Sequence, residues 1–490
     1  MNESPRDIDA IEVLRCADCA ASDSAAYDAI PIDYMPIPAE AAMGFRDGVP
    51  RMPRLNRHRF LKNGVLGVAS IYAASKIPWQ TAFEAAVAEG AVADNHCVVM
   101  LFLNGGNDGP NTFVPTDSAE HAAYTTLRPT IARSNVPLPQ VASPVGYTPM
   151  LGIESQLALP NLPGMAALNP AVPTLGRLKD LWDAGNIALF PATDYPNPNF
   201  SHFTSRDWWF GGVLEKSSTG WLGRWLDAYG SKTNPLQAVS IGSNVSKIIR
   251  AAQAPVASVP ETFGNFGFNV SGAVTAAVNG QVGALAATPP GNASTARSRT
   301  VYGQTVQVAS QLATITQTAG VNYPANSSLS RRLQAAANLL GAGLGTRVVT
   351  IDWGGFDTHG GQVASQDPQL TVLGQALAAF QADLTARGIQ DRVVTCVFSE
   401  FGRRGGENAS LGTDHGAGGP MQIIGTQVRG GLGGAPAPLT SLDRGNLRVT
   451  TDFRSVYGAL LSEWMGGDPG AVLPGAPLPL VRADGGNLFL

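Results

Sequence analysis

The chain has 490 residues, and its 33 Lys and Arg against 37 Asp and Glu give a formal net charge of −4. Hydrophobic residues make up 44% of the sequence and charged residues only 14%, which excludes an intrinsically disordered chain and indicates a globular protein. The slightly acidic balance argues against nucleic acid as the main partner, because phosphate binding needs a concentrated basic face. No stretch approaches the roughly 20 apolar residues of a membrane-spanning helix, so we expect no transmembrane segment in the mature protein.

The N-terminal region has the pattern of an export signal. Residues 51–62 carry five basic and no acidic residues, residues 64–75 form a short apolar run, and Ala91-Val92-Ala93 offers a small-residue cleavage site. Residues 57–62 (RHRFLK) are similar to the twin-arginine motif, although His58 replaces the second consecutive arginine. The alternative interpretation of this segment is an amphipathic surface helix.

These patterns divide the chain into three parts. We expect residues 1–50 to be an extension without fixed structure, unless Met43 or Met52 is the true start. Residues 51–93 form the twin-arginine-like signal, and residues 94–490 form an exported domain that is periplasmic or extracellular. Cys16 and Cys19 lie in the extension, where one isolated Cys-x-x-Cys pair is a weak signal for metal or redox chemistry.

The body of the chain alternates short apolar runs with segments of helical periodicity. The runs predict strands at 97–103, 187–191, 238–241, 347–351, 392–398 and 421–424. Helices are predicted at 174–184, 204–210, 221–229, 328–340, 370–387 and 452–465. This alternation indicates an α/β fold with a mostly parallel central sheet and helices on both faces. Residues 251–330 are rich in Ala and Gly, hold only three charged residues, and are expected to form an insertion over the sheet.

Polar residues that suit metal binding follow several predicted strands. Ligands bind beyond the carboxyl ends of the strands in such sheets, so these positions are the candidates for a site. Asp108 follows the first strand, while Asp352, Asp357 and His359 follow the strand 347–351. Carboxylates and an imidazole so close to a strand end suit a divalent metal or an acid/base pair.

The next predicted strand, 392–398, is followed by further charged residues. Glu400 offers another carboxylate, and Arg403 or Arg404 could bind an oxyanion in bidentate fashion. His415 comes after them in a glycine-rich loop, as His202 does earlier in the chain. Each residue alone could be an ordinary surface group, but their repetition after strands favours a site.

Ser201 stands between a Pro/Asn-rich loop and the predicted helix 204–210. A hydroxyl at a helix N-terminus can cap the helix, and it can also attack a substrate whose oxyanion is held by the free amides. Both interpretations remain open from the residues alone.

Six segments together resemble the bacterial domain-of-unknown-function family numbered 1501, whose exported proteins are grouped with the alkaline phosphatase/sulfatase superfamily. The segments are FLNGGNDGPNTFVP (102–115), SHFTSRDWW (201–209), GWLGRWLD (220–227), DTHGGQ (357–362), SEFGRRGGENASLGTDHG (399–416) and TDFRSVYG (451–458). The resemblance covers roughly residues 97–465 and implies an alkaline phosphatase-like α/β fold.

The resemblance also implies roles for individual residues. Ser201 matches the nucleophile, and the residues that match metal ligands are Asp108, Asp352, Asp357, His359, Glu400 and His415. His359 falls near the expected histidine position, which Gly361 occupies, and Phe401 stands where the superfamily has a second metal-binding histidine. One metal ion, or none, therefore fits the sequence better than two.

We thus expect an exported, metal-dependent hydrolase of phosphate or sulfate esters that acts on a small molecule or a polymer. A divalent cation (Zn, Mn, Mg or Ca) would activate Ser201, while Arg403, Arg404 or Arg206 would neutralise the oxyanion. The first alternative is a catalytically degenerate protein of the same fold that acts as an exported binding or structural component, as Phe401 suggests. The second is a metal-independent Ser-His-Asp hydrolase, although no Gly-x-Ser-x-Gly motif surrounds the serine.

Overall fold

The computed structural model describes residues 71–72, 96–133, 157–263, 280–315, 321–475 and 479–490, apart from positions 161, 172–173, 287, 289–291, 481 and 483–484. The N-terminal extension lies outside the described residues, and so does the signal segment except for Ile71–Tyr72. That pair forms β1, which is antiparallel to β7 (Val256–Val259). None of the described helices combines the length and the apolar character that crossing a bilayer requires.

A ten-stranded mixed sheet forms the centre of the described fold. Its other strands are β2 (Cys97–Asn104), β5 (Ile187–Asp194), β6 (Ala238–Ile241), β8 (Val348–Gly354), β9 (Val393–Phe398), β12 (Gly419–Ile424), β13 (Gly431–Leu432) and β14 (Thr451–Asp452). The order is β1–β7–β6–β8–β2–β9–β12–β5–β13, with β14 also beside β5. Strands β7, β6, β8, β2 and β9 run parallel, whereas β12 is antiparallel to both β9 and β5. The predicted α/β class with a mostly parallel sheet is confirmed.

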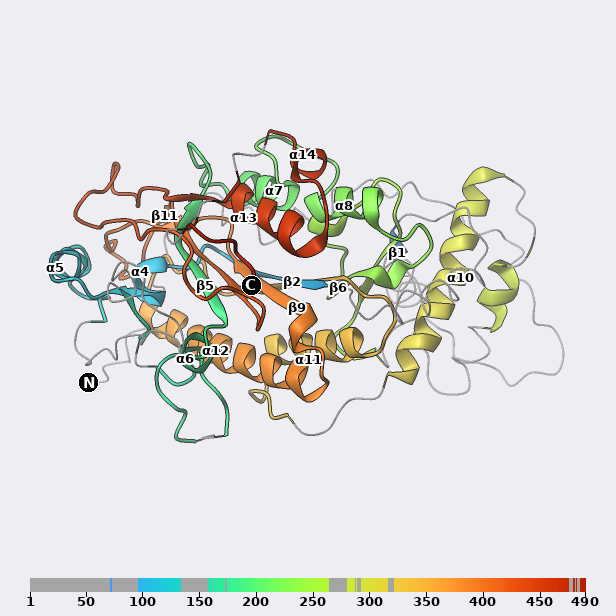
Figure 1. Cartoon of the computed structure of the whole chain (residues 1–490), viewed down its shortest axis with the longest axis horizontal. Helices are drawn as coiled ribbons and strands as arrows, with labels where there is room; N and C mark the ends of the chain where they lie inside the picture. Colours follow the sequence, from blue (N-terminus) through green and yellow to red (C-terminus); the bar gives the residue numbers. More distant parts are fainter. Residues whose placement is uncertain are drawn as a thin grey trace, which may run out of the picture. The chain divides into compact units, whose positions relative to one another are not determined.

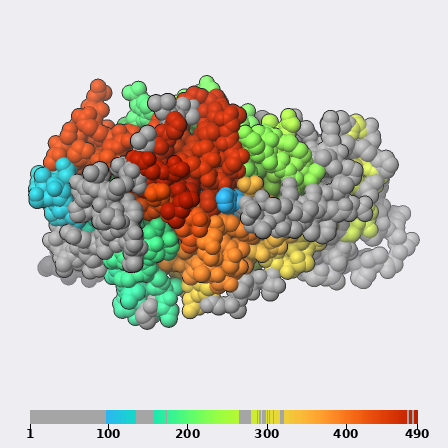
Figure 2. Space-filling model, viewed as in Figure 1, coloured from blue at the N-terminus to red at the C-terminus, as the bar shows by residue number. Residues whose placement is uncertain are grey.

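Helices cover both faces of this sheet (Figure 1). One layer contains α6 (Leu178–Asp183), α11 (Ser328–Gly341) and α12 (Gln362–Ala386). The other contains α7 (His202–Gly211), α8 (Trp221–Tyr229), α13 (Phe453–Ala459), the π-helical η7 (Leu460–Met465) and α14 (Pro469–Val472). In the space-filling view, the C-terminal segments in orange and red cover a broad patch beside α8 (Figure 2).

Central strand β2 shows why the sheet needs both layers. Its residues from Cys97 to Phe102 are fully buried, because successive side chains point to opposite faces and each face meets helices. Val99 and Leu101 pack in the α11/α12 core, and Met100 and Phe102 pack in the α7/α8 core. A continuous apolar run is therefore the sequence pattern that this position demands.

Smaller elements complete the described structure. Further helices are α4 (Gly109–Thr112), α5 (Ser118–Leu127), α10 (Ala293–Thr314) and the 3-10 turns η3 (Pro235–Gln237), η4 (Lys247–Ile249) and η6 (Gln390–Arg392), and residues 280–286 are also helical. Two short pairs of strands lie outside the main sheet: β3 (Val114–Pro115) with β4 (Leu157–Ala158), and β10 (Gly402–Arg403) with β11 (His415–Gly416). The predicted insertion at 251–330 contains β7, a strand of the main sheet.

The strand directions gather several loops at one edge of the sheet. Because β2, β8 and β9 are parallel neighbours, their carboxyl ends meet there. Strand β12 is antiparallel and starts at the same edge, so the segment between β9 and β12 leaves the edge and returns to it. Strand β5 runs in the same direction as β9, since both are antiparallel to β12. The polar segments singled out in the sequence thus converge.

Candidate metal centre

Three imidazoles and one carboxylate meet at this edge. His202 is the first residue of α7, Asp357 and His359 follow β8, and His415 lies in β11 before β12. Nε2 of His359 lies 2.9 Å from Nε2 of His415, and these two nitrogens lie 3.1 and 3.2 Å from Asp357 Oδ1. Nε2 of His202 lies 3.6 Å from Asp357 Oδ2. We call these four residues the histidine cluster.

The spacing within the histidine cluster is compatible with a bound metal ion. His202, Asp357 and His415 offer ligand atoms that all lie within 4.8 Å of one another. Four ligands about 2.0–2.1 Å from a tetrahedral Zn²⁺ are separated by about 3.3 Å. The measured separations of 2.9, 3.1, 3.2 and 3.6 Å scatter around that value. His/Asp/His composition and geometry therefore fit a small cation, with His359 placed to be a further ligand.

The opposite nitrogen of each imidazole also faces an acceptor. His202 Nδ1 lies 2.7 Å from Glu400 Oε1, and His415 Nδ1 lies 2.8 Å from the Phe200 carbonyl oxygen. His359 Nδ1 lies 3.5 Å from Asp414 Oδ1. A proton held on Nδ1 by such an acceptor leaves Nε2 free to bind a metal, and metal-ligating histidines almost always show this arrangement. All three Nε2 atoms are thus directed toward Asp357.

The charges of the histidine cluster are strongly coupled. Burial lowers the pKa of His202, but its hydrogen bonds to Asp357 and Glu400 outweigh burial and raise that pKa to about 9. Burial alone would raise the pKa of Asp357, yet the three histidines and the charge of Arg403 hold it far below its usual value. Burial and nearby positive charges lower the pKa of His415, against the effect of Asp357. Asp357 therefore remains a carboxylate, the form that binds a cation.

Glu400, a predicted ligand, lies behind His202. The residue is completely buried, and its carboxylate accepts hydrogen bonds from Gly105 N at 3.0 Å and from His202 Nδ1. In this position Glu400 orients His202 and is not itself part of the histidine cluster.

Phe401 packs against two imidazoles. Its ring centroid lies 4.9 Å from that of His202 and 4.4 Å from that of His415. The side chain is fully buried and brings no ligand atom to the place where a two-metal site would need one. At this position the chain therefore offers no imidazole for a second metal ion.

Arg403 and Arg404 have different surroundings from those expected of oxyanion ligands. The buried Arg403 guanidinium donates to the Gly106 carbonyl at 2.9 Å, the Thr413 carbonyl at 2.8 Å and Asp357 Oδ1 at 2.7 Å. Its donors are committed to the loops and to Asp357, so it fixes that carboxylate in place. Arg404 is exposed and donates to the Arg444 carbonyl at 2.8 Å.

Close backbone contact explains the glycines that follow β2. Gly105 has φ +122°, and a Cβ atom there would lie 2.2 Å from Asp357 N. At Gly106 a Cβ atom would lie 2.6 Å from the Phe401 ring. Only glycine permits this approach, which sets Asp357 and Phe401 in their positions.

Asp108, another predicted ligand, belongs to a buried network behind the histidine cluster. Its carboxylate pairs with Arg128 through contacts of 2.5 and 2.9 Å, and both side chains are inaccessible to solvent. Gln362 also donates to Asp108. Oε1 of the Gln362 side chain accepts hydrogen bonds from Thr358 Oγ1 at 3.0 Å and Thr413 Oγ1 at 2.6 Å. One amide thus joins the loops that carry His359 and His415.

The structure separates Asp352 from the histidine cluster. Its carbonyl oxygen accepts a hydrogen bond from Arg332. Desolvation of its carboxyl group outweighs the charges of Arg206 and Arg332 and raises its pKa to about 6. Of the six predicted ligands, the cluster brings together Asp357, His359 and His415.

Ser201 is the N-cap residue of α7 and lies directly before His202. Its hydroxyl makes no capping hydrogen bond, and Ser201 Oγ has no partner within the described part of the chain. The preceding residue, Phe200, binds His415 through its carbonyl oxygen. The hydroxyl therefore adjoins the cluster without forming a Ser-His pair.

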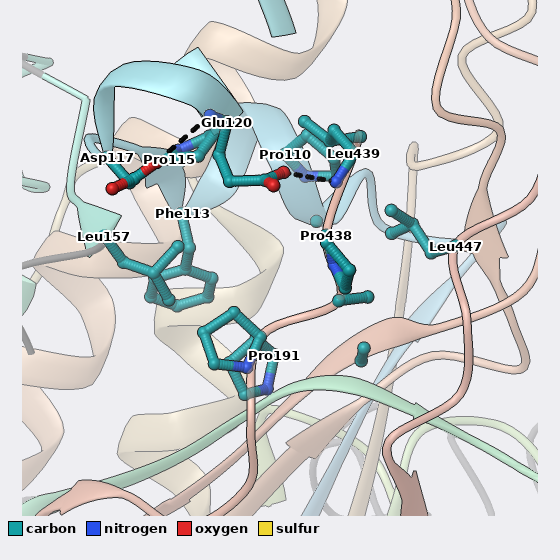
Figure 3. Close-up of a pocket in the computed structure, with 14 residues that line it drawn as sticks. Pro110, Phe113, Pro115, Asp117, Glu120, Leu157, Pro191, Pro438, Leu439 and Leu447 are labelled. Carbon is teal, nitrogen blue, oxygen red and sulfur yellow. Dashed lines mark hydrogen bonds between the residues drawn. The ribbon is translucent and has the colours of Figure 1, made fainter. Parts of the chain in front are cut away.

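A separate cavity of about 420 Å³ lies away from the cluster residues, with α4 and α5 on one side (Figure 3). Its walls are mainly proline and other apolar side chains, among them Pro110, Phe113, Pro191 and Leu439. Asp117 and Glu120 supply carboxylates at its α5 side. No member of the histidine cluster lines it.

The family profile described as "Protein of unknown function (DUF1501)" matches residues 191–438, just over half of the chain, and the chain belongs to this family. No curated protein matches it. Among solved structures, it is similar to a protein in the alkaline phosphatase superfamily from Vibrio parahaemolyticus, at 11% identity over 84% of this chain and 81% of that one, with a TM-score of 0.33.

Proposed function

We propose that this DUF1501 protein is an exported hydrolase of phosphate or sulfate esters with a single metal ion and a serine nucleophile. The ion would bind at His202, Asp357, His359 and His415, and Ser201 would attack the ester. The observation that carries the proposal is the convergence of three Nε2 atoms on one carboxylate, each with Nδ1 facing an acceptor.

The donor set favours zinc over the other cations expected from the sequence. Imidazole suits Zn²⁺ and other transition metals, whereas Ca²⁺ and Mg²⁺ prefer six or more oxygen ligands. Three nitrogens and one carboxylate therefore select against the two hard cations. When bound, the ion supplies a Lewis acid that lowers the pKa of a nearby hydroxyl.

The chain's own residues provide the remaining chemistry. Ser201 Oγ forms a bond to phosphorus or sulfur while the bond to the leaving alkoxide breaks. The hydroxyl proton passes to solvent, and the alkoxide takes a proton from solvent. Free amides in the first turn of α7 donate hydrogen bonds to the ester oxygens. Arg206, one turn beyond His202 on α7, brings a positive charge to the same end of the helix. Water then cleaves the serine ester and restores the hydroxyl.

Export of the protein is part of the same proposal. It rests on the basic run, the apolar run and the small-residue site within residues 51–93. Cell fractionation of the full-length chain in a bacterial host should place a shortened product outside the cytoplasm. A full-length product confined to the cytoplasm would reject export.

A second candidate is a protein of this fold that binds a metal without catalysing hydrolysis. Phe401 packed on two imidazoles and Arg403 bound to Asp357 favour it, because both restrict the space and the charge available to a substrate. Under this proposal the protein binds a polymer or glycan as an exported structural component.

Metal analysis and ester hydrolysis together test the proposal. Purified protein should contain about one zinc per chain and should cleave an aryl phosphate or an aryl sulfate. Ser201→Ala should abolish cleavage and retain the metal, whereas Ser118→Ala, at an exposed helix start, should leave both unchanged. Metal-loaded protein whose hydrolysis is unaffected by Ser201→Ala would refute the serine mechanism, and stoichiometric metal without hydrolysis would favour the second candidate.

A further inference from the structure

Exposed apolar residues lie within four residues of each histidine of the histidine cluster in the sequence. Phe203, Val363 and Leu411 have 37%, 39% and 47% of their surface exposed, although large apolar side chains are mostly buried in this fold. Phe203 directly follows His202, and Val363 and Leu411 lie in the segments that carry the other two histidines. The surroundings of the polar centre therefore include apolar surface.

Val363 and Leu411 belong to two segments that are distant in the chain and joined by backbone hydrogen bonds. The backbone N–H of Gln362 donates to the Leu411 carbonyl at 2.9 Å, and Gly361 N donates to the Ser410 carbonyl at 3.0 Å. These bonds hold the start of α12 against the turn that contains Leu411. We call Val363 and Leu411 the apolar shelf.

Leu411 occupies its position in an unfavourable backbone conformation. Its φ is +58°, in the left-handed region that glycine and asparagine adopt more readily than leucine. Asn408 stabilises the turn, because its Oδ1 accepts hydrogen bonds from Ser410 N at 3.0 Å and Gly412 N at 3.1 Å. Burial of the side chain cannot compensate for the strain, since nearly half of that side chain is exposed. Strain of this kind concentrates at functional sites.

The turn is fixed relative to the histidine cluster. Asn408 Nδ2 donates to the His359 carbonyl at 3.0 Å and to Asp414 Oδ1 at 3.0 Å. Gly412 packs so closely that a Cβ atom there would lie 2.3 Å from the carbonyl carbon of His359. The exposed leucine is thus held at a set position next to a proposed metal ligand.

We propose that the apolar shelf binds an alkyl or aryl group of the substrate, so that the protein acts on esters with a hydrophobic substituent. This inference rests on the proposed function, because the ester group must lie at the histidine cluster while its substituent lies on the shelf. Two apolar side chains offer contacts to a short alkyl chain or a single ring rather than to a larger group. A protein partner would need about 800 Å² on this side, far more than the shelf offers.

Binding of substrate analogues that cannot be hydrolysed tests the shelf separately from catalysis. Methylphosphonate and butylphosphonate differ by three methylene groups and can be titrated into zinc-loaded full-length protein by calorimetry. A fully buried methylene contributes about a factor of four in affinity, and on a half-exposed surface we expect about twofold for each. The wild-type protein should therefore bind butylphosphonate about eightfold more tightly than methylphosphonate.

Leu411→Gly is the informative variant, because glycine adopts the positive φ without strain and removes the side chain. The affinity ratio of the two phosphonates should fall to about threefold or less, with methylphosphonate binding unchanged. Leu168→Gly, at another exposed leucine with 51% of its surface accessible, is the matched control and should retain the wild-type ratio.

The outcomes separate this inference from the proposed function. A preference for butylphosphonate that Leu411→Gly removes, in a protein that hydrolyses no ester, would support the shelf and reject the hydrolase. Hydrolysis of aryl esters together with equal affinities for the two phosphonates would reject the shelf and leave the hydrolase standing. Failure to bind any alkylphosphonate or alkylsulfonate would overturn the inference, as would a ratio that Leu411→Gly leaves at the wild-type value.

Discussion

Replacing Asp108 by asparagine should destabilise the protein and leave its metal content intact. The carboxylate is inaccessible to solvent and lies 2.5 and 2.9 Å from two nitrogens of Arg128, which is buried equally deeply. Charges about 3 Å apart attract each other by about 5–6 kcal/mol at an effective dielectric constant of about 20. Asp108→Asn removes this attraction and leaves a buried guanidinium without a counter-charge, a change that costs about 3–5 kcal/mol in other proteins.

Several contacts place the expected loss at the lower end of that range. Arg128 also donates to the carbonyls of Gly405 at 2.8 Å and Arg404 at 2.9 Å, and to Asn111 Oδ1 at 2.9 Å, and these bonds survive the substitution. We therefore expect the free energy of unfolding to fall by about 3 kcal/mol.

Urea unfolding of metal-saturated protein, with elemental analysis of each sample, provides the assay. The double variant Asp108→Asn/Arg128→Met should lose less stability than the sum of the two single variants, because the pair acts as a unit. An unchanged unfolding midpoint combined with loss of the metal would refute this account and would make Asp108 a ligand.

Three further predictions concern the histidine ligands, the glycine after β2 and the binding of zinc. Glu400→Gln should weaken zinc affinity about 10–100-fold in a chelator competition, because His202 loses a charged acceptor. Asp414→Asn should weaken the affinity less, because Asp414 lies farther from His359 Nδ1 than Glu400 lies from His202 Nδ1. Equal affinities in both variants would contradict the role of Glu400 in orienting His202. Gly105→Ala should lower the free energy of unfolding by about 2–4 kcal/mol, since its Cβ would collide with the backbone, while Gly343→Ala, with positive φ and open space, should cost about 1 kcal/mol. Zinc at about 1,000 times its dissociation constant should stabilise the apoprotein by about 4 kcal/mol and raise its unfolding temperature in a calorimetric scan. The unfolding temperature of a variant lacking the His415 imidazole should not rise when zinc is added.

The sequence predicts the main sheet well because its strands are buried on both faces. Strand 238–241 is found at the predicted residues, and strand 97–103 extends by one residue. Strand β7 escaped prediction, since Ala257 and Ser258 interrupt its β-branched residues and leave no distinct apolar run. Helix α12 begins eight residues before its predicted start, since hydrogen bonds to the 410–411 turn determine its first residues.

The candidate site is harder to predict because it depends on direction and on distant partners. The sequence places His202 before a helical pattern, but the orientation of His202 toward Asp357 depends on Glu400, almost 200 residues away. Asp108 has the chemistry of a ligand, and only the fold reveals that Arg128 neutralises it. The residues next to His202 or Asp108 in the sequence do not reveal these partners, because the pairs form only when the loops pack together at the edge of the sheet.

The side-chain amide of Gln362 has a consequence for how the proposed metal centre would acquire an ion. Since one side chain restrains both histidine-bearing loops through Thr358 and Thr413, the shape of the centre is established by folding and does not require the cation to organise it. A preformed centre could be filled after the polypeptide has matured. The affinity of such a site for divalent transition metals rises toward Cu²⁺ and falls again at Zn²⁺, so metal availability as well as affinity decides which ion binds. The ion that the protein finally carries would then reflect the supply in the compartment where loading takes place.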